Sequence, residues 1–315
     1  MRLVVAYGCN DAYVEYTGIS MISLFENNKE FEFIDIVFVD MNLSDESKSI
    51  FVSITNKYNR NIRFVPFAIL CKELKIDSIG RHIQTIYAKL FFSRLEDVDK
   101  ILYIDSDTII DGSLEELWKM DIEEFYIAGV ETISSVKLNT SVGMSMSDCF
   151  INDGVVLINL KKWRVDDIEK EFISYIKKYN GNPPVYSEGT INAVCKGNIL
   201  RINPRYNLLS GIIFYKVKDI IKMTQMDFYT QEIINMAVSK PVIIHYLCGF
   251  YNRPWNKRCS HPLKSRYLYY KDISPWKDEK LKSDRLPVRL TIIKILYMIL
   301  PFRLFQLTRS ILGTK

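Results

Sequence analysis

The sequence predicts an α/β fold in which helices flank both faces of a mostly parallel β-sheet. Three observations support this fold class. The chain has 315 residues, of which 48% are hydrophobic and 25% charged, so it can bury a large core. Short apolar runs alternate with stretches of helical period through its first two-thirds. Polar and acidic residues follow several of these runs, where ligands bind in parallel sheets.

The expected strands are short apolar runs that end in turn-forming or polar residues. They occupy residues 3–7, 34–39, 62–65, 101–104, 155–160 and 242–245. Helices are expected at residues 13–25, after Ser44, and at residues 161–178 and 188–194. Ser44 is a favourable helix cap, and Asp45 and Glu46 suit the positive end of the helix dipole. Because parallel strands share one carboxyl edge, we expect Asn10 and Asp105 on the same side of the sheet.

Charge is distributed unevenly along the chain. The net charge is +5, from 42 Lys and Arg against 37 Asp and Glu. Residues 256–315 carry 14 of the basic and 4 of the acidic side chains, which leaves 28 basic and 33 acidic for residues 1–255. A body that is acidic is not expected to bind nucleic acid. We therefore predict a globular domain at residues 1–255 and a basic region at residues 256–315.

The spacing of the cysteines indicates whether the protein works in a reducing compartment. All six are scattered, with no CxxC pair and no spacing typical of a metal site, so we expect reduced thiols and a cytoplasmic protein. We expect no signal peptide, because no long apolar segment or cleavage site follows Met1. No run approaches the roughly 20 apolar residues that cross a bilayer.

Asp105 and Asp107 follow the apolar run at residues 101–104. Two carboxylates at this spacing cannot both be buried without a partner, because an isolated buried charge costs several kcal/mol. A divalent cation such as Mg²⁺ or Mn²⁺, which prefers oxygen ligands, would resolve this conflict. The alternative is a solvated turn in which Asp107 or Asp111 caps the following helix.

His245 ends another apolar run and is one of three histidines in the chain. An imidazole beside two carboxylates favours Mn²⁺ over Mg²⁺ and completes a set of three ligands. Further along, Gly249 permits close backbone approach, and Arg253 offers a guanidinium fork for a phosphate group. The alternative is a histidine that is simply hydrogen-bonded within the core.

Together these segments resemble glycosyltransferase family 8, whose members are retaining enzymes with a GT-A fold and include bacterial lipopolysaccharide and capsule galactosyl- and glucosyltransferases. The resemblance covers roughly residues 1–255 and rests on five segments. These are Val4 to Ala6 leading into Asn10 to Tyr13, Thr85 to Leu90, Tyr103 to Asp107, Asn152 to Leu160 followed by Lys161 to Arg164, and His245 to Trp255.

The resemblance implies a divalent metal cofactor, a UDP-hexose donor and a site for each. Asp105, Asp107 and His245 would bind the metal. The residues implied for donor binding are Ala6, Asn10, Asp11, Tyr13, Lys89, Asp105, Ser106, Gly154, Gly249 and Arg253. Glu188 would orient or stabilise the reacting sugar, and Asn152 would hydrogen-bond one of its hydroxyls. The alternatives are that Glu188 is an exposed carboxylate at a helix start and that Asp153 caps a turn.

Three departures from the family pattern concern the site. Gly189 follows Glu188 where members often carry a Gln that has been discussed as a nucleophile. Asn10 stands where an Asp often contacts the uracil and ribose, so that contact could pass to Asp11. The segment after His245 is longer than the usual spacing and has Arg253 where Lys is usual, which keeps the charge, as does Lys89 where Arg is more usual. Without the Gln, the simpler hypothesis is a front-face reaction in which the leaving phosphate accepts the acceptor's proton.

Two other functions fit parts of the sequence. A phosphohydrolase of the haloacid-dehalogenase type also places Asp-x-Asp after an apolar strand, but Ile109 stands where that pattern has Thr or Val. A catalytically decayed, membrane-bound scaffold that only binds sugar nucleotides would explain Gly189 and Asn10. Retention of the complete set of metal ligands argues against it.

The end of the chain mixes cations with apolar side chains between residues 285 and 309. Its longest uncharged run, residues 295–302, is too short to span a bilayer. We predict two short amphipathic helices on an anionic membrane surface, where each cation contributes roughly 1 kcal/mol. The alternative is a helix packed on the body or on a second subunit. A peripheral position on the inner face of the cytoplasmic membrane would suit a lipid-linked glycan acceptor.

Overall fold

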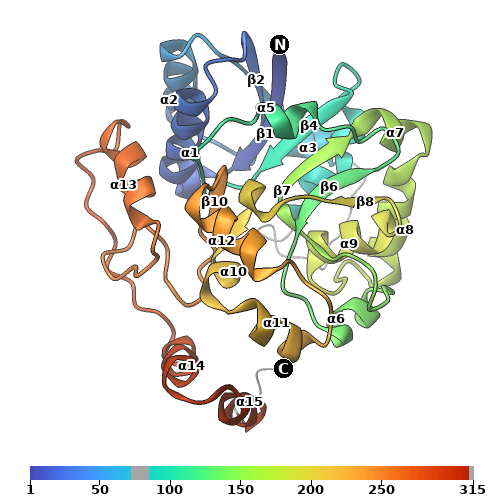
Figure 1. Cartoon of the computed structure of the whole chain (residues 1–315). Helices are drawn as coiled ribbons and strands as arrows, with labels where there is room; N and C mark the ends of the chain where they lie inside the picture. Colours follow the sequence, from blue (N-terminus) through green and yellow to red (C-terminus); the bar gives the residue numbers. More distant parts are fainter. Residues whose placement is uncertain (72–84, 312–315) are drawn as a thin grey trace.

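The computed structural model describes residues 1–71 and 85–311 and contains two β-sheets surrounded by helices (Figure 1). The large sheet has the strand order β3-β2-β1-β4-β7-β6-β8 and the small one the order β5-β10-β9. The strands of the large sheet are β1 (Arg2–Cys9), β2 (Phe33–Asp40), β3 (Asn61–Pro66), β4 (Lys100–Ile104), β6 (Ile127–Glu131), β7 (Ile151–Asn159) and β8 (Ile199–Arg201). Those of the small sheet are β5 (Thr108–Ile110), β9 (Leu208–Leu209) and β10 (Ile243–His245).

The predicted fold class is confirmed, because every strand of the large sheet except β7 runs in the same direction. Strand β7 lies antiparallel between β4 and β6 and pairs Val155 with Ile104. It begins at Ile151, four residues before the strand expected from sequence. The missed residues include Asn152, Asp153 and Gly154, which are buried but belong to types that are uncommon in strands, so the sequence did not mark the start.

The helices follow the strands in the expected order. They are α1 (Val14–Asn27), α2 (Asp45–Lys57), α3 (Phe67–Leu70), α5 (Glu115–Lys119), α6 (Val136–Ser141), α7 (Leu160–Val165), α8 (Ile168–Lys178), α9 (Tyr186–Cys195), α10 (Ser210–Phe214), α11 (Val217–Thr224), α12 (Gln231–Ser239), α13 (Lys264–Asp272), α14 (Val288–Ile299) and α15 (Phe302–Ile311). Three 3₁₀ helices, η1 (Asp11–Tyr13), η2 (Thr85–Arg94) and η3 (Pro204–Tyr206), complete the described elements. Ser44 caps α2, where its hydroxyl accepts a hydrogen bond from the amide of Ser47.

Two local predictions are wrong. The single helix expected at residues 161–178 is split into α7 and α8, because Asp167 adopts a left-handed conformation with a φ of 53° that no α-helix can contain. The alternative in which Asp107 or Asp111 caps the next helix also fails. Residues 108–110 form strand β5, and Asp111 instead accepts a hydrogen bond from the Tyr270 hydroxyl.

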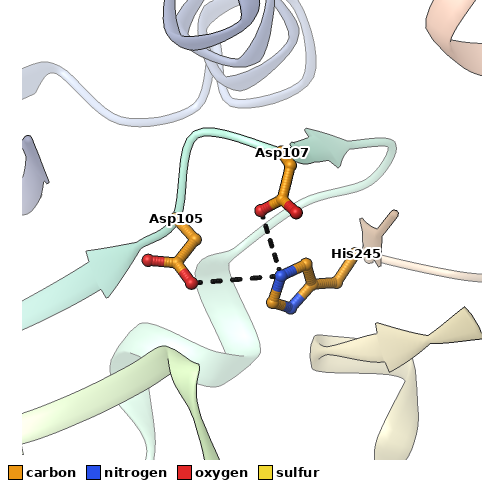
Figure 2. Close-up of side chains that lie close together, drawn as sticks. All are labelled: Asp105, Asp107 and His245. Carbon is orange, nitrogen blue, oxygen red and sulfur yellow. Dashed lines mark ion pairs between the residues drawn. The ribbon is translucent and has the colours of Figure 1, made fainter. Parts of the chain in front are cut away.

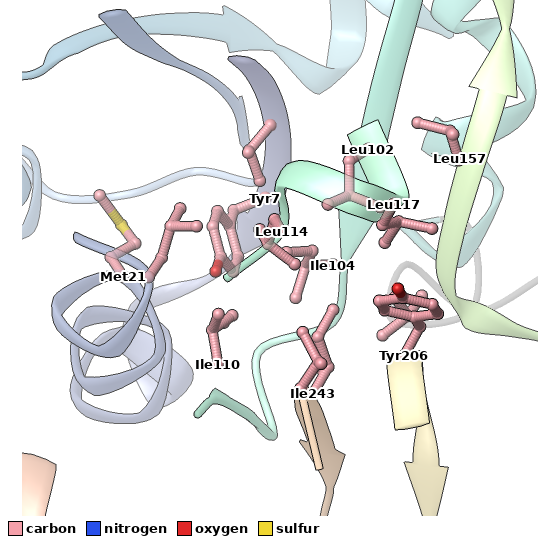
Figure 3. Close-up of a cluster of buried hydrophobic side chains, with 14 of the residues drawn as sticks. Tyr7, Met21, Leu102, Ile104, Ile110, Leu114, Leu117, Leu157, Tyr206 and Ile243 are labelled. Atoms are coloured by element: carbon pink, nitrogen blue, oxygen red, sulfur yellow. The ribbon is translucent and has the colours of Figure 1, made fainter. Parts of the chain in front are cut away.

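Hydrophobic clusters fill the space on both faces of the large sheet. The cluster drawn in Figure 3 joins Tyr7 and Ile104 of the large sheet to Ile110 and Ile243 of the small one. Each of these side chains is at most 1% exposed. The two sheets therefore share one core, which fixes the position of β5 and β10 beside the carboxyl end of β4.

Residues 256–284 pack on the body. Tyr267 and Tyr270 of α13 are buried in one cluster with Tyr16 of α1. The Tyr16 ring stacks on Trp255 with 3.9 Å between ring centroids. Lys271 is itself buried and donates hydrogen bonds to the carbonyls of Trp276 and Glu279. Part of the basic charge after residue 255 is therefore used to satisfy backbone oxygens.

Helices α14 and α15 lie at the edge of the molecule, beyond α11 (Figure 1). Among the described residues, every helix is too short or too polar to pass through a bilayer. The two short helices predicted near the end of the chain are present, separated at Leu300 and Pro301.

Candidate active site

Three side chains predicted to bind a metal meet at the carboxyl end of β4 (Figure 2). Asp105 and Asp107 lie in the turn from β4 to β5, and His245 is the last residue of β10. The antiparallel pairing of β5 with β10 places His245 opposite Thr108. The His245 Nε2 lies 3.1 Å from the Asp107 Oδ1 and 4.0 Å from the Asp105 Oδ2.

The chemistry of this set fits a divalent cation. One donor atom from each residue lies within 4.8 Å of the others. His245 is 1% exposed, and its Nε2 has no hydrogen-bond partner in the described part of the chain. Burial lowers the pKa of His245, which favours the neutral imidazole that binds metals. A cation would satisfy both the orphaned nitrogen and the two facing carboxylates.

Neighbouring groups orient the first aspartate. The Tyr103 hydroxyl donates a hydrogen bond of 2.6 Å to the Asp105 Oδ1, which leaves the Oδ2 facing His245. The Asp105 amide donates to the carbonyl of Gly154 in β7 at 2.7 Å. Ser106 accepts a hydrogen bond of 2.8 Å from the Thr17 hydroxyl of α1. The turn between β4 and β5 is therefore held from both sides.

A cleft of about 430 Å³ opens in front of these groups. The predicted site residues along its wall are Asn10, Tyr13, Asp105, Ser106, Asp107, His245 and Arg253. Six further residues line it that were not among the predicted site residues, namely Gly8, Cys9, Met41, Ile86, Tyr103 and Leu247. Ile86, Tyr103 and Leu247 lie within segments that resemble the family, whereas Gly8, Cys9 and Met41 carry no distinctive pattern. Arg253 forms an ion pair with Asp107 and donates a 2.6 Å hydrogen bond to the carbonyl of Tyr246. Gly249, in the same loop as Arg253, has a positive φ of 30°.

Five residues implied for donor binding lie outside the lining of this cleft, namely Ala6, Asp11, Lys89, Gly154 and Gly249. Ala6 is buried within β1. The Asp11 carboxylate accepts a hydrogen bond of 3.1 Å from the amide of Ser44, at the start of α2. Hydrogen bonds from Ser47 and Ser44 lower the pKa of Asp11. Asp11 thus ties the loop after β1 to α2, while Asn10 caps η1 by accepting from the amide of Ala12.

Lys89 of η2 points into the protein. Its Nζ lies 2.8 Å from the carbonyl oxygen of Asp153 and 3.1 Å from the Asp153 Oδ2. It also stands 4.1 Å from the centroid of the Tyr103 ring. The Ser187 hydroxyl donates to the same carboxylate at 2.6 Å. Asp153 is therefore the buried counter-ion of Lys89, and the alternative in which it caps a turn is wrong.

Behind the cleft, Asn152 and Glu188 are in contact. The Asn152 Nδ2 donates a hydrogen bond of 2.8 Å to the Glu188 Oε2. Burial, and then the nearby Asp153 carboxylate, raise the pKa of Glu188 to about 8. Asn207 bridges Asn152 and His245, with hydrogen bonds of 2.9 Å to each. Sequence reasoning missed Asn207, because a lone Asn between short elements gives no signal.

The backbone explains why Gly189 carries no side chain. A Cβ at this position would lie 1.9 Å from the carbonyl oxygen of Pro184. Val185 and Tyr186, which precede it, have left-handed φ angles of 48° and 50°. No side chain, Gln included, fits residue 189 on this turn. The Gly that replaces the family's usual Gln at residue 189 is therefore required by the local backbone.

The fold and the site together describe an α/β protein with a group of side chains suited to a divalent cation at the carboxyl ends of its strands. The sequence profile of glycosyl transferase family 8 matches residues 4–259, and the chain belongs to that family. It is therefore a glycosyltransferase, and membership excludes the phosphohydrolase alternative.

Curated relatives cover most of this chain. A putative glycosyltransferase of Haemophilus influenzae is 29% identical over 82% of the chain and 74% of its own length. The lipopolysaccharide 1,3-galactosyltransferase of Salmonella typhimurium is 25% identical over 86% of the chain and 78% of its own length. The lipopolysaccharide 1,2-glucosyltransferase of Escherichia coli K12 is 23% identical over 90% of the chain and 81% of its own length.

A solved structure has the same fold. The galactosyltransferase LgtC, crystallised with donor and acceptor sugar analogues, superposes with a TM-score of 0.68 and 22% identity. The superposition covers 87% of this chain and 96% of that one. The predicted GT-A fold is confirmed.

The close approach of Gly154 to the metal ligands gives a testable prediction. A Cβ at residue 154 would lie 2.4 Å from the His245 Cε1 and 2.5 Å from the Asp105 Oδ2, so Gly154→Ala must displace both ligands. We expect Mn²⁺ affinity, measured by electron paramagnetic resonance, to fall by about 10- to 100-fold. Gly112→Ala is the control, because a Cβ there meets no atom closer than 3.5 Å. Unchanged affinity in Gly154→Ala would place the cation elsewhere.

Proposed function

We propose that this chain transfers galactose or glucose from a UDP-sugar to a glycan or glycolipid acceptor, with retention of configuration, in lipopolysaccharide or cell-surface polysaccharide synthesis. The observation that carries the proposal is the joint position of Asp105, Asp107, His245 and Arg253 on one cleft. Such a cleft provides ligands for a cation and, beside them, the fixed positive charge of Arg253. Both positive charges are needed to neutralise the diphosphate of a donor. The lipopolysaccharide galactosyl- and glucosyltransferase relatives support the hexose and the acceptor class.

The residues divide the task of donor binding. Asp105, Asp107 and His245 would hold Mn²⁺, which the imidazole ligand favours over Mg²⁺, and the cation would neutralise the diphosphate of the donor. The Arg253 guanidinium would exchange its ion pair with Asp107 for a phosphate oxygen. Tyr13, whose side chain is exposed at the cleft, and Asn10 would contact the nucleoside.

Asn152 and Glu188 would act on the donor sugar. Asn152 is fixed by its hydrogen bond to Glu188 and by another from the amide of Gly154. The positive charge that develops on the sugar carbon would favour the ionised carboxylate of Glu188. Because Gly189 leaves no side chain to form a covalent intermediate, the leaving phosphate would accept the proton of the acceptor hydroxyl at the same face.

A screen of UDP-sugars for metal-dependent hydrolysis tests this function. We expect slow release of one hexose in Mn²⁺, loss of that release in EDTA and none from Asp107→Ala, which lacks a metal ligand. Asp278→Ala, which changes an exposed carboxylate outside the cleft, is the control and should match the wild type. Absence of hydrolysis with every UDP-sugar, combined with tight sugar-nucleotide binding, would support a binding scaffold instead.

Replacement of Glu188 tests its role in the chemical step. Glu188→Gln keeps the size of the side chain and its contact with Asn152 but cannot ionise when positive charge develops on the sugar. We expect kcat for transfer to fall by about 100-fold while the KM for the donor changes little. Glu171→Gln on the exposed side of α8 is the control. Full activity of Glu188→Gln would exclude the proposed role.

We also propose that α14 and α15 attach the enzyme to an anionic membrane surface on the cytoplasmic side. Ile293 and Phe305 are buried, and the Tyr297 hydroxyl donates a hydrogen bond of 2.9 Å to Asp219. These contacts secure the helices to the body. The apolar side chains on their exposed surface are Val288, Ile292, Ile295, Met298, Ile299, Leu304 and Leu307. Such a surface beside basic residues suits a leaflet of acidic lipids.

Liposome binding tests this attachment. A chain ending at Leu286 keeps α13 in the core, so it should fold and lose binding to vesicles rich in phosphatidylglycerol. Met298→Asp should weaken binding of the full chain, because this side chain is 71% exposed on α14. Val165→Asp changes a similarly exposed apolar residue on α7, 75% exposed, and is the matched control. Equal binding by the full and shortened chains would contradict the proposal.

A further inference from the structure

Asn207 connects the candidate metal site to the residues behind it. It lies between η3 and β9, and β9 runs parallel to β10 with Leu208 beside Ile244. This pairing brings the Asn207 side chain against the Nδ1 side of the His245 ring. Asn207 is 0% exposed, so its amide needs hydrogen-bond partners inside the protein.

Hydrogen bonds fix the orientation of the neighbouring Asn152 amide. The Asn152 Oδ1 accepts from the backbone amide of Gly154 at 3.1 Å, and the Asn152 Nδ2 donates to the Glu188 carboxylate at 2.8 Å. A flipped Asn152 would set its Nδ2 against a backbone N–H and its oxygen against a carboxylate. The Asn152 Oδ1 is therefore an acceptor for Asn207 as well.

The orientation of Asn152 determines that of Asn207. Since the Asn152 Oδ1 only accepts, the Asn207 Nδ2 must face it, at 2.9 Å. The Asn207 Oδ1 then faces the His245 Nδ1, also at 2.9 Å. A carbonyl oxygen cannot donate, so the Nδ1 carries the hydrogen and the Nε2 retains its lone pair.

A competing tautomer makes this contact necessary. The Asp107 Oδ1 lies 3.1 Å from the His245 Nε2, and its negative charge would favour a hydrogen on that nitrogen. That tautomer would occupy the nitrogen lone pair on which a cation depends. Without an acceptor at the Nδ1, the carboxylate of Asp107 would favour it.

We propose that Asn207 is a positioning residue that holds His245 in the Nδ1–H tautomer and thereby keeps its Nε2 available to a cation. Asn207 also donates a hydrogen bond to Asn152, which in turn donates one to Glu188, so the His245 tautomer and the orientation of Asn152 depend on each other. The proposal rests on the function proposed above, in which His245 is a metal ligand.

Histidine NMR and Mn²⁺ binding test the proposal in the full-length protein. The chain has three histidines, so ¹⁵N-histidine spectra can be assigned with His82→Gln and His261→Gln variants. We expect the metal-free wild type to show the Nδ1–H tautomer at His245. Asn207→Ala should convert it to the Nε2–H tautomer and weaken Mn²⁺ binding by about 10- to 100-fold.

Two further variants separate positioning from folding. Asn207→Asp retains an oxygen acceptor for the Nδ1–H, although it loses the donor to the Asn152 Oδ1, so it should keep the Nδ1–H tautomer and bind Mn²⁺ more tightly than Asn207→Ala. Asn28→Ala removes another fully buried asparagine, which bonds to Leu24 and Leu114 at the far end of α1, and should change neither measurement.

The outcomes are distinct. An Nδ1–H tautomer and unchanged Mn²⁺ affinity in Asn207→Ala would overturn the proposal. If Asn207→Ala does not fold, loss of the Nδ1–H tautomer in folded Asn207→Asp would overturn it instead. A wild type that binds no Mn²⁺ would refute the proposed metal site, while the tautomer spectra would still decide the role of Asn207.

Discussion

Strands β5 and β10 are joined through three residue pairs, and the last pair sets His245 opposite Thr108. This short antiparallel ladder lies beside the carboxyl end of β4 because Ile110 and Ile243 share a core cluster with Tyr7 and Ile104. The imidazole consequently reaches two carboxylates that the chain places about 140 residues earlier. A shift of one residue in this register would turn His245 to the other face of its strand, away from the carboxylates of Asp105 and Asp107.

The polar residues around the ladder obey one constraint, which is that charges buried in a protein need partners. Lys89 and Asp153 neutralise each other, and Asp107 pairs with Arg253. The Nε2 of His245 is the exception, because it is buried without a hydrogen-bond partner in the described residues. Because this unpartnered nitrogen faces the carboxylates of Asp105 and Asp107, it indicates a position for a cation rather than a defect of packing.

Much of the fold and of the metal set could be predicted from the sequence. Asp105 and Asp107 follow one apolar run and His245 ends another, and the residue types themselves identify the chemistry. Lys89 was expected to face the donor, but its partner became visible only once β7 was placed antiparallel beside β4. Asn207 could not be identified, because its role depends on contacts with residues 38 and 55 positions away.

In the C-terminal part of the chain, too, the sequence did not predict which residues make contacts inside the protein. Its basic charge predicted a surface role, yet Lys271 is buried and bonded to carbonyl oxygens, and Tyr267 and Tyr270 belong to the core. Composition cannot distinguish a lysine that meets solvent from one that caps a backbone turn. The exposed apolar residues are instead concentrated on α14 and α15, where Met298 and Ile299 are more than half exposed.

The most direct test of the central claim is a crystal structure of the protein grown with Mn²⁺ and UDP, with data collected at the manganese absorption edge. The account predicts one anomalous peak within bonding distance of the Asp105, Asp107 and His245 side chains, with the diphosphate of UDP beside Arg253. A peak bound by other residues, or UDP held without manganese at these three side chains, would contradict it.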